Sequence, residues 1–420
     1  MPDTVSGADA PSREDANRIL PIDIIQLFLF TGFAFSYSLY MSDLLPGTLY
    51  YTSMAAFIIF AAARVAWLVL VAQPRAPLAF GKSACALFGA AAVLVFISIV
   101  QEINAAGDFS YTSFGAIIYI VIPVLSALCI ANTVTLRLAD VYMTVLLARY
   151  VFFFLISDKF SIEAIQSISW VDSQSPFESS FAHDLLVVGL YFVVRQKAIR
   201  AGLALAFTML ALKRASFLLS PLLIIFRRQI RYSPPPKSTS VLALFVVGAV
   251  SPFAVMAAYS QTSSEFFENT FGVDLDEFTS GRLSIYQLAT NCAESSHAFG
   301  SLNICLSDTA FRVGGTTWNG LLHNDTLRVY MEVGLIGVVV YVAALTYASR
   351  TSRPAFILMM YAFFVLITSR LITHMSFWIV LFIAIALLER FQSSRDEFSG
   401  RCIALPEQEV RIQSTQRETK

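Results

Sequence analysis

Long apolar runs separated by short polar segments dominate the chain. They predict helices near residues 23–41, 50–72, 83–101, 112–131, 138–157, 181–196, 201–212, 215–227, 239–259, 326–347, 354–371 and 375–389. Many approach the ~20 residues that a helix needs to cross the hydrocarbon core of a bilayer. The seventh and eighth are short, which leaves open one broken helix or two helices that meet at Lys213 and Arg214. The pattern predicts an all-α polytopic integral membrane protein with about 12 transmembrane helices.

The composition favours the same class. The chain is 56% hydrophobic and 14% charged, and its mean hydropathy is +0.66. A soluble domain would carry roughly 25% charged residues. The formal net charge is zero and does not point to a partner. We expect membrane lipids as partners and no nucleic acid.

The distribution of charge predicts the topology. Residues 1–22 are polar and lack the pattern of a cleaved signal peptide, so they are expected to form a cytoplasmic tail. Residues 23–389 would form the membrane domain, and residues 390–420 a second cytoplasmic tail. With the N-terminus inside, the internal connections are rich in arginine and lysine and the external connections are mostly acidic, as the positive-inside rule requires.

One external connection, residues 260–325, is far longer than the others. Loops above ~15 residues are uncommon unless they are functional or disordered. This one contains aromatic residues, glycines and two cysteines, Cys292 and Cys305, so we expect it to be folded. Outside the membrane the cysteines could form a disulfide, which would stabilise the loop by about 3 kcal/mol. The sequence leaves open whether they pair.

One predicted helix begins with an unusual number of polar groups. In LLHNDTLRVYMEVGLIGVVVY, residues 321–341, His323, Asn324 and Asp325 precede the apolar run and Arg328 and Glu332 lie within it. Asn324 or Asp325 is a candidate N-cap. The other two are spaced i, i+4, so they share a helix face and can pair. Ionisable groups in a membrane helix usually face a bundle interior or a wet cavity and mark function.

Other charges lie at breaks between helices or inside apolar runs. Lys213 and Arg214 lie between two short helices, and Arg282 follows Ser280, a candidate N-cap. Without a functional role, these basic side chains would be interfacial or solvated. Arg64, Asp140 and Arg149 fall within apolar runs, and we expect such charges to form ion pairs between helices.

Two segments carry a family resemblance. HNDTLRVYMEVGLIG, residues 323–337, resembles the His-Asn signature of the O-antigen ligase and polymerase superfamily, which assembles bacterial envelope glycans. There too, the pair is followed by a leucine, an acidic residue and a Gly-Leu-Ile-Gly stretch. SGRLSIYQ, residues 280–287, is similar to the family's Gly-Arg element in the periplasmic loop, with Tyr286 where tryptophan is usual.

Two earlier segments extend the resemblance. LALKRASFLLS, residues 210–220, resembles the family's Ser-Arg-Gly break between two short helices, with Lys213 in place of the serine and Ala215 in place of the glycine. SSFAHDLLVVGLYF, residues 179–192, is similar to a small, polar helix start found upstream in the family. The resemblance implies an integral-membrane glycosyltransferase of GT-C-like architecture in the bacterial inner membrane, with no metal or other cofactor.

The implied reaction assigns roles to these residues. An acceptor hydroxyl would attack the anomeric carbon of a glycan on undecaprenyl diphosphate at the periplasmic face. His323 suits the general base, because an imidazole titrates near neutral pH. Arg282 and Arg214 would neutralise the departing diphosphate, since arginine forks match phosphate oxygens. The expected substrate-binding residues are Lys213, Asn324, Arg328 and Glu332.

The sequence leaves the acceptor open. A polymerase would extend an exopolysaccharide or O-antigen, and this is the interpretation we favour, while a ligase would transfer the glycan to lipid A core. The expected partners are the lipid-linked donor, either acceptor and a chain-length regulator. A transporter or lipid-linked glycan flippase would also suit about 12 helices, but such carriers often contain internal repeats, and none is evident in this chain.

Overall fold

The structure is a computed structural model of the 420-residue chain. The described residues are 19–72, 78–106, 115–157, 161–166, 181–211, 214–232, 234–261, 265, 268–269, 282–293, 298–308, 310–313, 316–319, 322, 324–369, 371–372 and 374–392.

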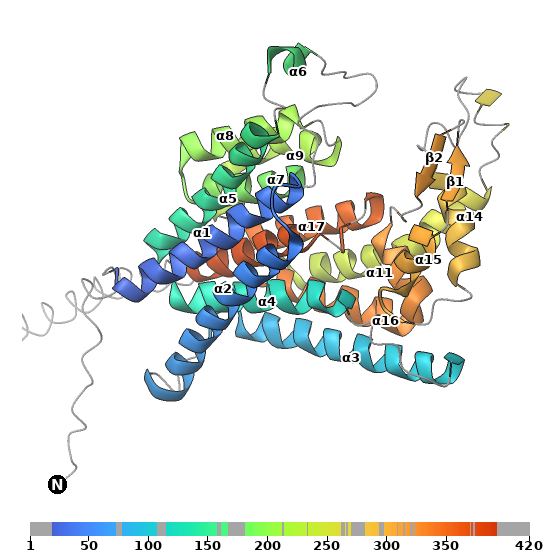
Figure 1. The fold of residues 1–420 in the computed structure, drawn as a ribbon, viewed down its shortest axis with the longest axis horizontal. Coiled ribbons are helices and arrows are strands. Elements are labelled where there is room, and N and C mark those ends of the chain that lie inside the picture. Colours follow the sequence, from blue (N-terminus) through green and yellow to red (C-terminus); the bar gives the residue numbers. More distant parts are fainter. Residues whose placement is uncertain are drawn as a thin grey trace, which may run out of the picture.

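Each of the twelve predicted apolar runs is helical in the described residues (Figure 1). The helices are α1 (Pro21–Met41), α2 (Gly47–Trp67, continued by a π turn, Leu68–Ala72), α3 (Gly81–Ala106), α4 (Gly115–Thr133), α5 (Leu136–Ile156), α7 (Ala182–Val194), α8 (Ala198–Leu210), α9 (Arg214–Ile225), α11 (Ser238–Gln261), α16 (Asp325–Ser349), α17 (Arg353–Thr368) and the last described helix, Met375–Gln392, which we call the Met375 helix. The first of these helices begins at Pro21, before the predicted start at 23, and the last ends at Gln392, after the predicted end at 389. The seventh and eighth runs are two helices, α8 and α9, rather than one broken helix.

Within the described residues, six helices are long and apolar enough to cross a membrane. They are Pro21–Met41, Gly47–Val71, Gly81–Asn104, Leu136–Ile156, Asp325–Ser349 and Met375–Gln392. The remaining apolar helices are shorter, and α7, α8 and α9 have only 13, 13 and 12 residues. These features are consistent with a polytopic, multi-pass membrane protein.

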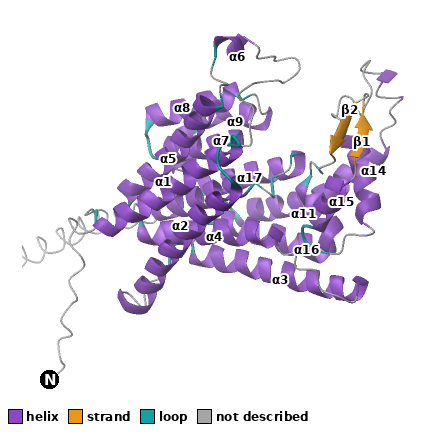
Figure 2. Cartoon of the chain, in the orientation of Figure 1, coloured by secondary structure: helices purple, strands orange, loops and turns teal. Residues whose placement is uncertain are grey.

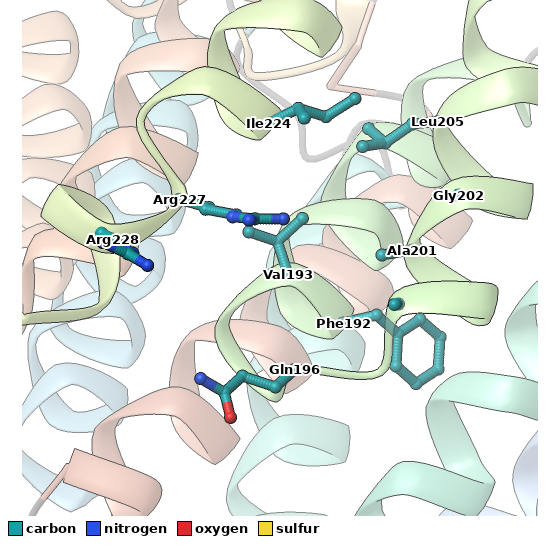
Figure 3. A pocket seen from close by; sticks show the side chains of 10 residues that line it. Phe192, Val193, Gln196, Ala201, Gly202, Leu205, Ile224, Arg227 and Arg228 are labelled. Atoms are coloured by element: carbon teal, nitrogen blue, oxygen red, sulfur yellow. The ribbon is translucent and has the colours of Figure 1, made fainter.

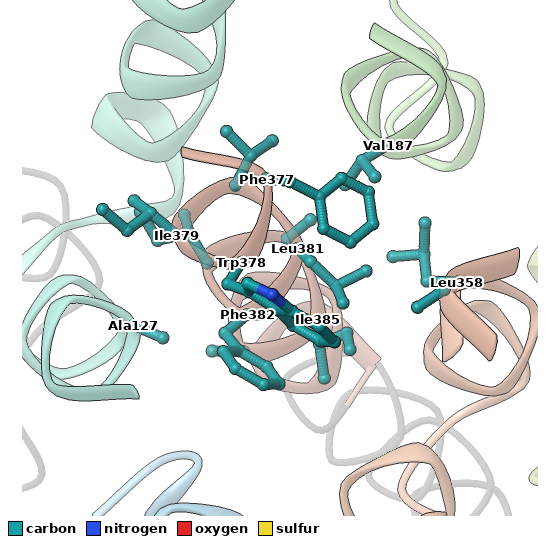
Figure 4. Packing of buried hydrophobic residues seen from close by; sticks show 14 of the residues in the cluster. Ala127, Val187, Leu358, Phe377, Trp378, Ile379, Leu381, Phe382 and Ile385 are labelled. Atoms are coloured by element: carbon teal, nitrogen blue, oxygen red, sulfur yellow. The ribbon is translucent and has the colours of Figure 1, made fainter. Parts of the chain in front are cut away.

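The Met375 helix forms the centre of the bundle. It is the most buried of the six long helices, and nearly all of its apolar side chains are inaccessible. Figure 4 shows Ala127 of α4, Val187 of α7 and Leu358 of α17 around it, approaching it from different sides. Trp378 stacks on Phe382 and fills the space between these helices. A helix that is apolar all round is stable only when it is enclosed in this way.

Ion pairs join neighbouring helices, as the sequence predicts. Arg64 of α2 lies 2.7 Å from a carboxylate oxygen of Asp23 in α1. Asp140 of α5 accepts a hydrogen bond of 2.9 Å from Arg195, which directly follows α7. The third charge, Arg149, also pairs between helices. Each pair replaces the hydration that these groups lose inside the bundle.

The long connection before α16 is folded, as predicted, and holds the described strands. It contains α14 (Arg282–Ala293), α15 (Ser301–Asp308) and an antiparallel hairpin of β1 (Ala310–Val313) and β2 (Thr316–Asn319) (Figure 2). An all-α prediction misses this hairpin. Its sequence signal is two short runs that flank Gly-Gly, a dipeptide suited to tight hairpin turns.

A second, small hydrophobic core attaches this loop to the bundle. It brings together Ile285 and Ala289 of α14, Leu302 and Leu306 of α15, and Leu327 of α16. A disulfide also joins the two loop cysteines, whose Cα atoms lie 5.9 Å apart. The structure therefore contains the paired form, one of the two states that the sequence left open.

The remaining described helices are short. They are α6 (Ile162–Gln166), which lies in the connection between α5 and α7, and α10 (Arg227–Tyr232), which follows α9.

Candidate functional site

Hydrogen bonds show that three helices begin at the same end of the bundle. Asp184, near the start of α7, accepts a bond of 2.6 Å from Ser376, near the start of the Met375 helix. Asp325, the first residue of α16, accepts bonds from the backbone N–H groups of Leu371 and Ile372, the latter at 2.6 Å. We call the end where α7, α16 and the Met375 helix begin the polar end.

Asn324 caps α16, so the predicted cap is confirmed and assigned to this residue. Its Oδ1 atom accepts bonds from the N–H of Leu327 at 3.0 Å and the hydroxyl of Thr326 at 2.8 Å. The whole side chain is buried. Its amide nitrogen, Nδ2, has no hydrogen-bond partner among the described residues.

Arg328 and Glu332 form the predicted i, i+4 pair. The Arg328 Nε atom lies 3.0 Å from Glu332 Oε1, and both side chains are about 1% exposed. The same carboxylate accepts bonds from the backbone N–H of Gly300 at 2.7 Å and of Leu302 at 3.1 Å. Glu332 therefore holds the start of α15 against α16. The prediction that it faces the interior is confirmed, and its contacts here anchor the loop.

The described residues that were predicted to bind substrate differ in their hydrogen bonding. The Glu332 carboxylate has several donors, whereas Asn324 and Arg328 each have a donor atom without an acceptor. The Glu332 carboxylate receives one charged and two backbone donors, which suits its position at the N-terminus of α15, where N–H groups are exposed. Asn324 Nδ2 and Arg328 Nη1 are both buried and lack acceptors in the described part of the chain. Buried polar groups are nearly always hydrogen-bonded, so two such donors on one turn of α16 suit an oxygen-rich ligand.

A second buried cluster lies at the polar end, and Arg149 is the only one of its members singled out from the sequence. Arg149 of α5 donates through Nη2 to Asp184 and to the hydroxyl of Ser376, the latter at 2.6 Å. Its guanidinium carbon lies 5.1 Å from the ring centre of Phe181 and 5.7 Å from that of Tyr37. Arg149 Nε and Asp184 Oδ1 have no hydrogen-bond partner among the described residues.

A buried histidine lies beside this cluster. His183 of α7 is 7% exposed, and its Nδ1 atom is 2.9 Å from the hydroxyl of Tyr361 in α17. Its ring also packs edge-on against Phe377. His183 is not among the predicted site residues, although a His-Asp pair at the start of an apolar run is a visible signal.

The predicted basic residues are placed only in part. Arg282 is the first residue of α14, which packs against α16, and Arg214 is the first residue of α9, which packs against α7 and α17. Their side chains lie outside the described part of the structure, as do Lys213 and His323 entirely. The helix that begins at Arg282, α14, thus contacts α16 directly. The helix that begins at Arg214, α9, contacts α7 and α17.

The described site contains basic and amide donors. No group of three or more His, Cys, Asp or Glu residues in the described ranges could hold a metal ion. The arrangement at the start of α16 can chemically bind anionic or carbonyl oxygens. No protein-family model and no curated protein matches the chain.

Proposed function

We propose that this protein is a glycosyltransferase of the O-antigen ligase and polymerase type. It would transfer a glycan from undecaprenyl diphosphate to a sugar hydroxyl, with polymerisation of exopolysaccharide or O-antigen favoured. The observation that carries the proposal is the pair of buried donors without partners in the described chain, Asn324 Nδ2 and Arg328 Nη1, the first on the residue next to His323 and the second one helical turn further on. Two such donors suit phosphate or sugar oxygens.

The proposed setting is the bacterial inner membrane, with about 12 transmembrane helices in a GT-C-like arrangement. Both termini would be cytoplasmic and the polar end periplasmic. The disulfide between Cys292 and Cys305 supports this orientation, because disulfides persist in oxidising compartments. Arg227 and Arg228, near the opposite end of the bundle, support it through the positive-inside rule.

In the proposed reaction, separate residues act as the general base, stabilise the leaving group and bind the substrate. His323 accepts the proton of the acceptor hydroxyl as its oxygen attacks the anomeric carbon. The bond from that carbon to the phosphate oxygen breaks, and the lipid diphosphate leaves with the bonding electrons. Arg282 and Arg214 stabilise the negative charge that develops on it. The Asn324 and Arg328 donors hold oxygens of the substrate.

An in vitro transfer assay tests the proposal. The purified protein in detergent receives an undecaprenyl diphosphate-linked oligosaccharide in the presence of EDTA, and the products are separated on a gel. A ladder of longer lipid-linked glycans would establish a metal-independent polymerase. Transfer only after addition of lipid A core would establish a ligase. Absence of both products, with intact donor and folded protein, would refute the transferase.

Matched variants test the roles. His323→Ala should abolish transfer, whereas His297→Ala, in the same loop, should leave it near the wild-type rate. Arg282→Lys keeps the charge but loses the fork, so a severe loss is expected. Arg312→Lys, elsewhere in the loop, is its control. Near-normal product from His323→Ala would contradict the general-base role.

A transporter or flippase is the second candidate, favoured by the buried Arg149–Asp184 pair. Charges inside a helical bundle are typical of transport pathways. Proteoliposomes loaded with labelled lipid-linked glycan would distinguish the two. Movement of the glycan between leaflets without elongation, abolished by Asp184→Asn, would favour transport over transfer.

A further inference from the structure

A cavity of about 760 Å³ lies at the end of the bundle opposite the polar end. It lies between the end of α7, the start of α8, the end of α9 and the start of α10. Part of its wall is apolar and includes Phe192, Leu205 and Ile224 (Figure 3). The described residues of the proposed transfer site, Asn324, Arg328 and Glu332, lie towards the polar end, so this cavity is a separate feature.

The polar part of the wall is basic. Arg227 and Arg228, the first two residues of α10, line the cavity, and Figure 3 shows Arg227 extending towards Val193 across its middle. Both are exposed, and neither forms an ion pair with a described residue. Gln196 adds an amide at the α7–α8 turn, where its φ of 58° lies in the left-handed region that few residues other than glycine adopt.

Two nearby basic residues, unlike Arg227 and Arg228, have an acidic partner. Arg195 and Lys197 flank Gln196, and both contact the Asp140 carboxylate, at 2.9 and 3.6 Å. An acidic partner thus neutralises part of the charge on the α7–α8 turn. Arg227 and Arg228 form no ion pair with a described residue and lie beside an apolar wall. This combination suits a ligand that is anionic at one end and apolar at the other.

The lengths of the surrounding helices favour a lipid. Helices α8 and α9, whose Leu203 and Ile225 side chains are exposed, have 13 and 12 residues. At 1.5 Å per residue these are only about 18–20 Å long, against a hydrocarbon core of about 30 Å. A bilayer meeting such a short section becomes thinner locally or allows polar groups to enter it. Lipid headgroups would therefore come within reach of Arg227 and Arg228.

We propose that this cavity binds an anionic phospholipid. The two arginines bind the phosphate, because guanidinium groups donate paired hydrogen bonds to phosphate oxygens. The Gln196 amide supplies a further donor. An acyl chain lies along Ile224 and past Gly202, two exposed apolar residues of the wall. This inference requires only that the protein spans a bilayer and does not rest on the proposed transferase activity.

Native mass spectrometry of the full-length protein in detergent tests the proposal. The protein is titrated with phosphatidylglycerol, with phosphatidylcholine of the same acyl chains, and with inorganic phosphate. We expect phosphatidylglycerol to bind at least tenfold more tightly than phosphatidylcholine. Arg227→Gln with Arg228→Gln should weaken it roughly tenfold for each arginine, since a charge-assisted bond supplies about that factor.

Gly202→Leu provides a variant that keeps both arginines. A Cβ atom at Gly202 would meet nothing within 4 Å, so leucine enters the cavity without a clash. Leucine also favours the helix more than glycine, so the variant should remain folded. We expect it to lose the bound phospholipid. Lys237→Gln removes an exposed charge outside the cavity wall and should bind as the wild type does.

Three outcomes would overturn the proposal. The first is equal affinity for the two lipids in the wild-type protein. The second is an equal loss of binding in Lys237→Gln and in the arginine variant, which would indicate a general effect of charge. The third is inorganic phosphate that binds as tightly as phosphatidylglycerol, which would identify a soluble phosphate compound as the ligand.

Discussion

The pair formed by Arg328 and Glu332 allows a quantitative test of how the loop is attached. Glu332→Gln removes the negative charge but keeps the shape and one acceptor oxygen. Arg328 is then left charged and buried, and one of the two backbone donors, Gly300 or Leu302, loses its acceptor. Removal of one member of a buried pair costs ~3–5 kcal/mol. We expect a loss in the free energy of unfolding within that range.

A second variant identifies the source of this loss. Arg328→Leu combined with Glu332→Gln removes both charges, so no buried ion is left unpaired. The glutamine oxygen still accepts one backbone N–H. We expect the double variant to be ~2 kcal/mol more stable than Glu332→Gln alone, because replacing both ions with neutral groups is often nearly neutral.

Reversible unfolding in mixed micelles gives the free energies, and hydrogen exchange locates the effect. In Glu332→Gln, exchange should increase at residues 298–308, which include α15, and stay unchanged in α1. A loss below ~1 kcal/mol would refute the reasoning, since a broken buried pair costs more than that. So would a double variant no more stable than the single one.

Three other substitutions test separate features. Gly334→Ala should destabilise α16 by ~1–2 kcal/mol, because φ is 71° there, whereas Gly89→Ala, with equally open space, should be neutral or stabilising; equal effects in thermal melting would refute this. Cys292→Ser with Cys305→Ser should lower loop stability by ~3 kcal/mol and accelerate limited proteolysis within 260–325, and unchanged cleavage would contradict it. Asp140→Asn leaves Arg195, Lys197 and the hydroxyl of Tyr191, which donates to Asp140 at 2.9 Å, without a carboxylate partner. It should lower the melting temperature through a loss of ~1–3 kcal/mol, and an unchanged temperature would count against the ion pairs.

Most helices could be predicted because their signal is local. An uninterrupted apolar run is recognisable wherever it lies, and the run predicted at 326–347 is the helix Asp325–Ser349. The pairing of Arg328 with Glu332 is equally local, since four residues bring side chains onto one face. The Asn324 cap depends on the next three residues alone. Each of these predictions needed no knowledge of the tertiary structure.

Partners that are distant in sequence could not be predicted. Ser376 lies 227 residues from Arg149, and the backbone that binds Asp325 lies 46 and 47 residues after it. Apolar periodicity does not indicate which helices are neighbours, so these contacts have no sequence signal. The positive φ of Gly334 was also not predicted, because a glycine within an apolar run gives no signal of its backbone conformation. The roles proposed for His323, Arg214 and Arg282 remain predictions.

The Arg328–Glu332 pair also affects how the chain enters the bilayer during synthesis. Its two charges lie in one helix, so they can neutralise each other before later helices exist. A lone charge at the centre of an inserting helix costs ~2.5–3.5 kcal/mol, which disfavours release from the translocon into lipid. Asp23, in the first turn of α1, has no basic partner in its own helix and pairs only when Arg64 of α2 emerges. We therefore expect α1 and α2 to leave the translocon together, whereas α16 can partition into lipid alone.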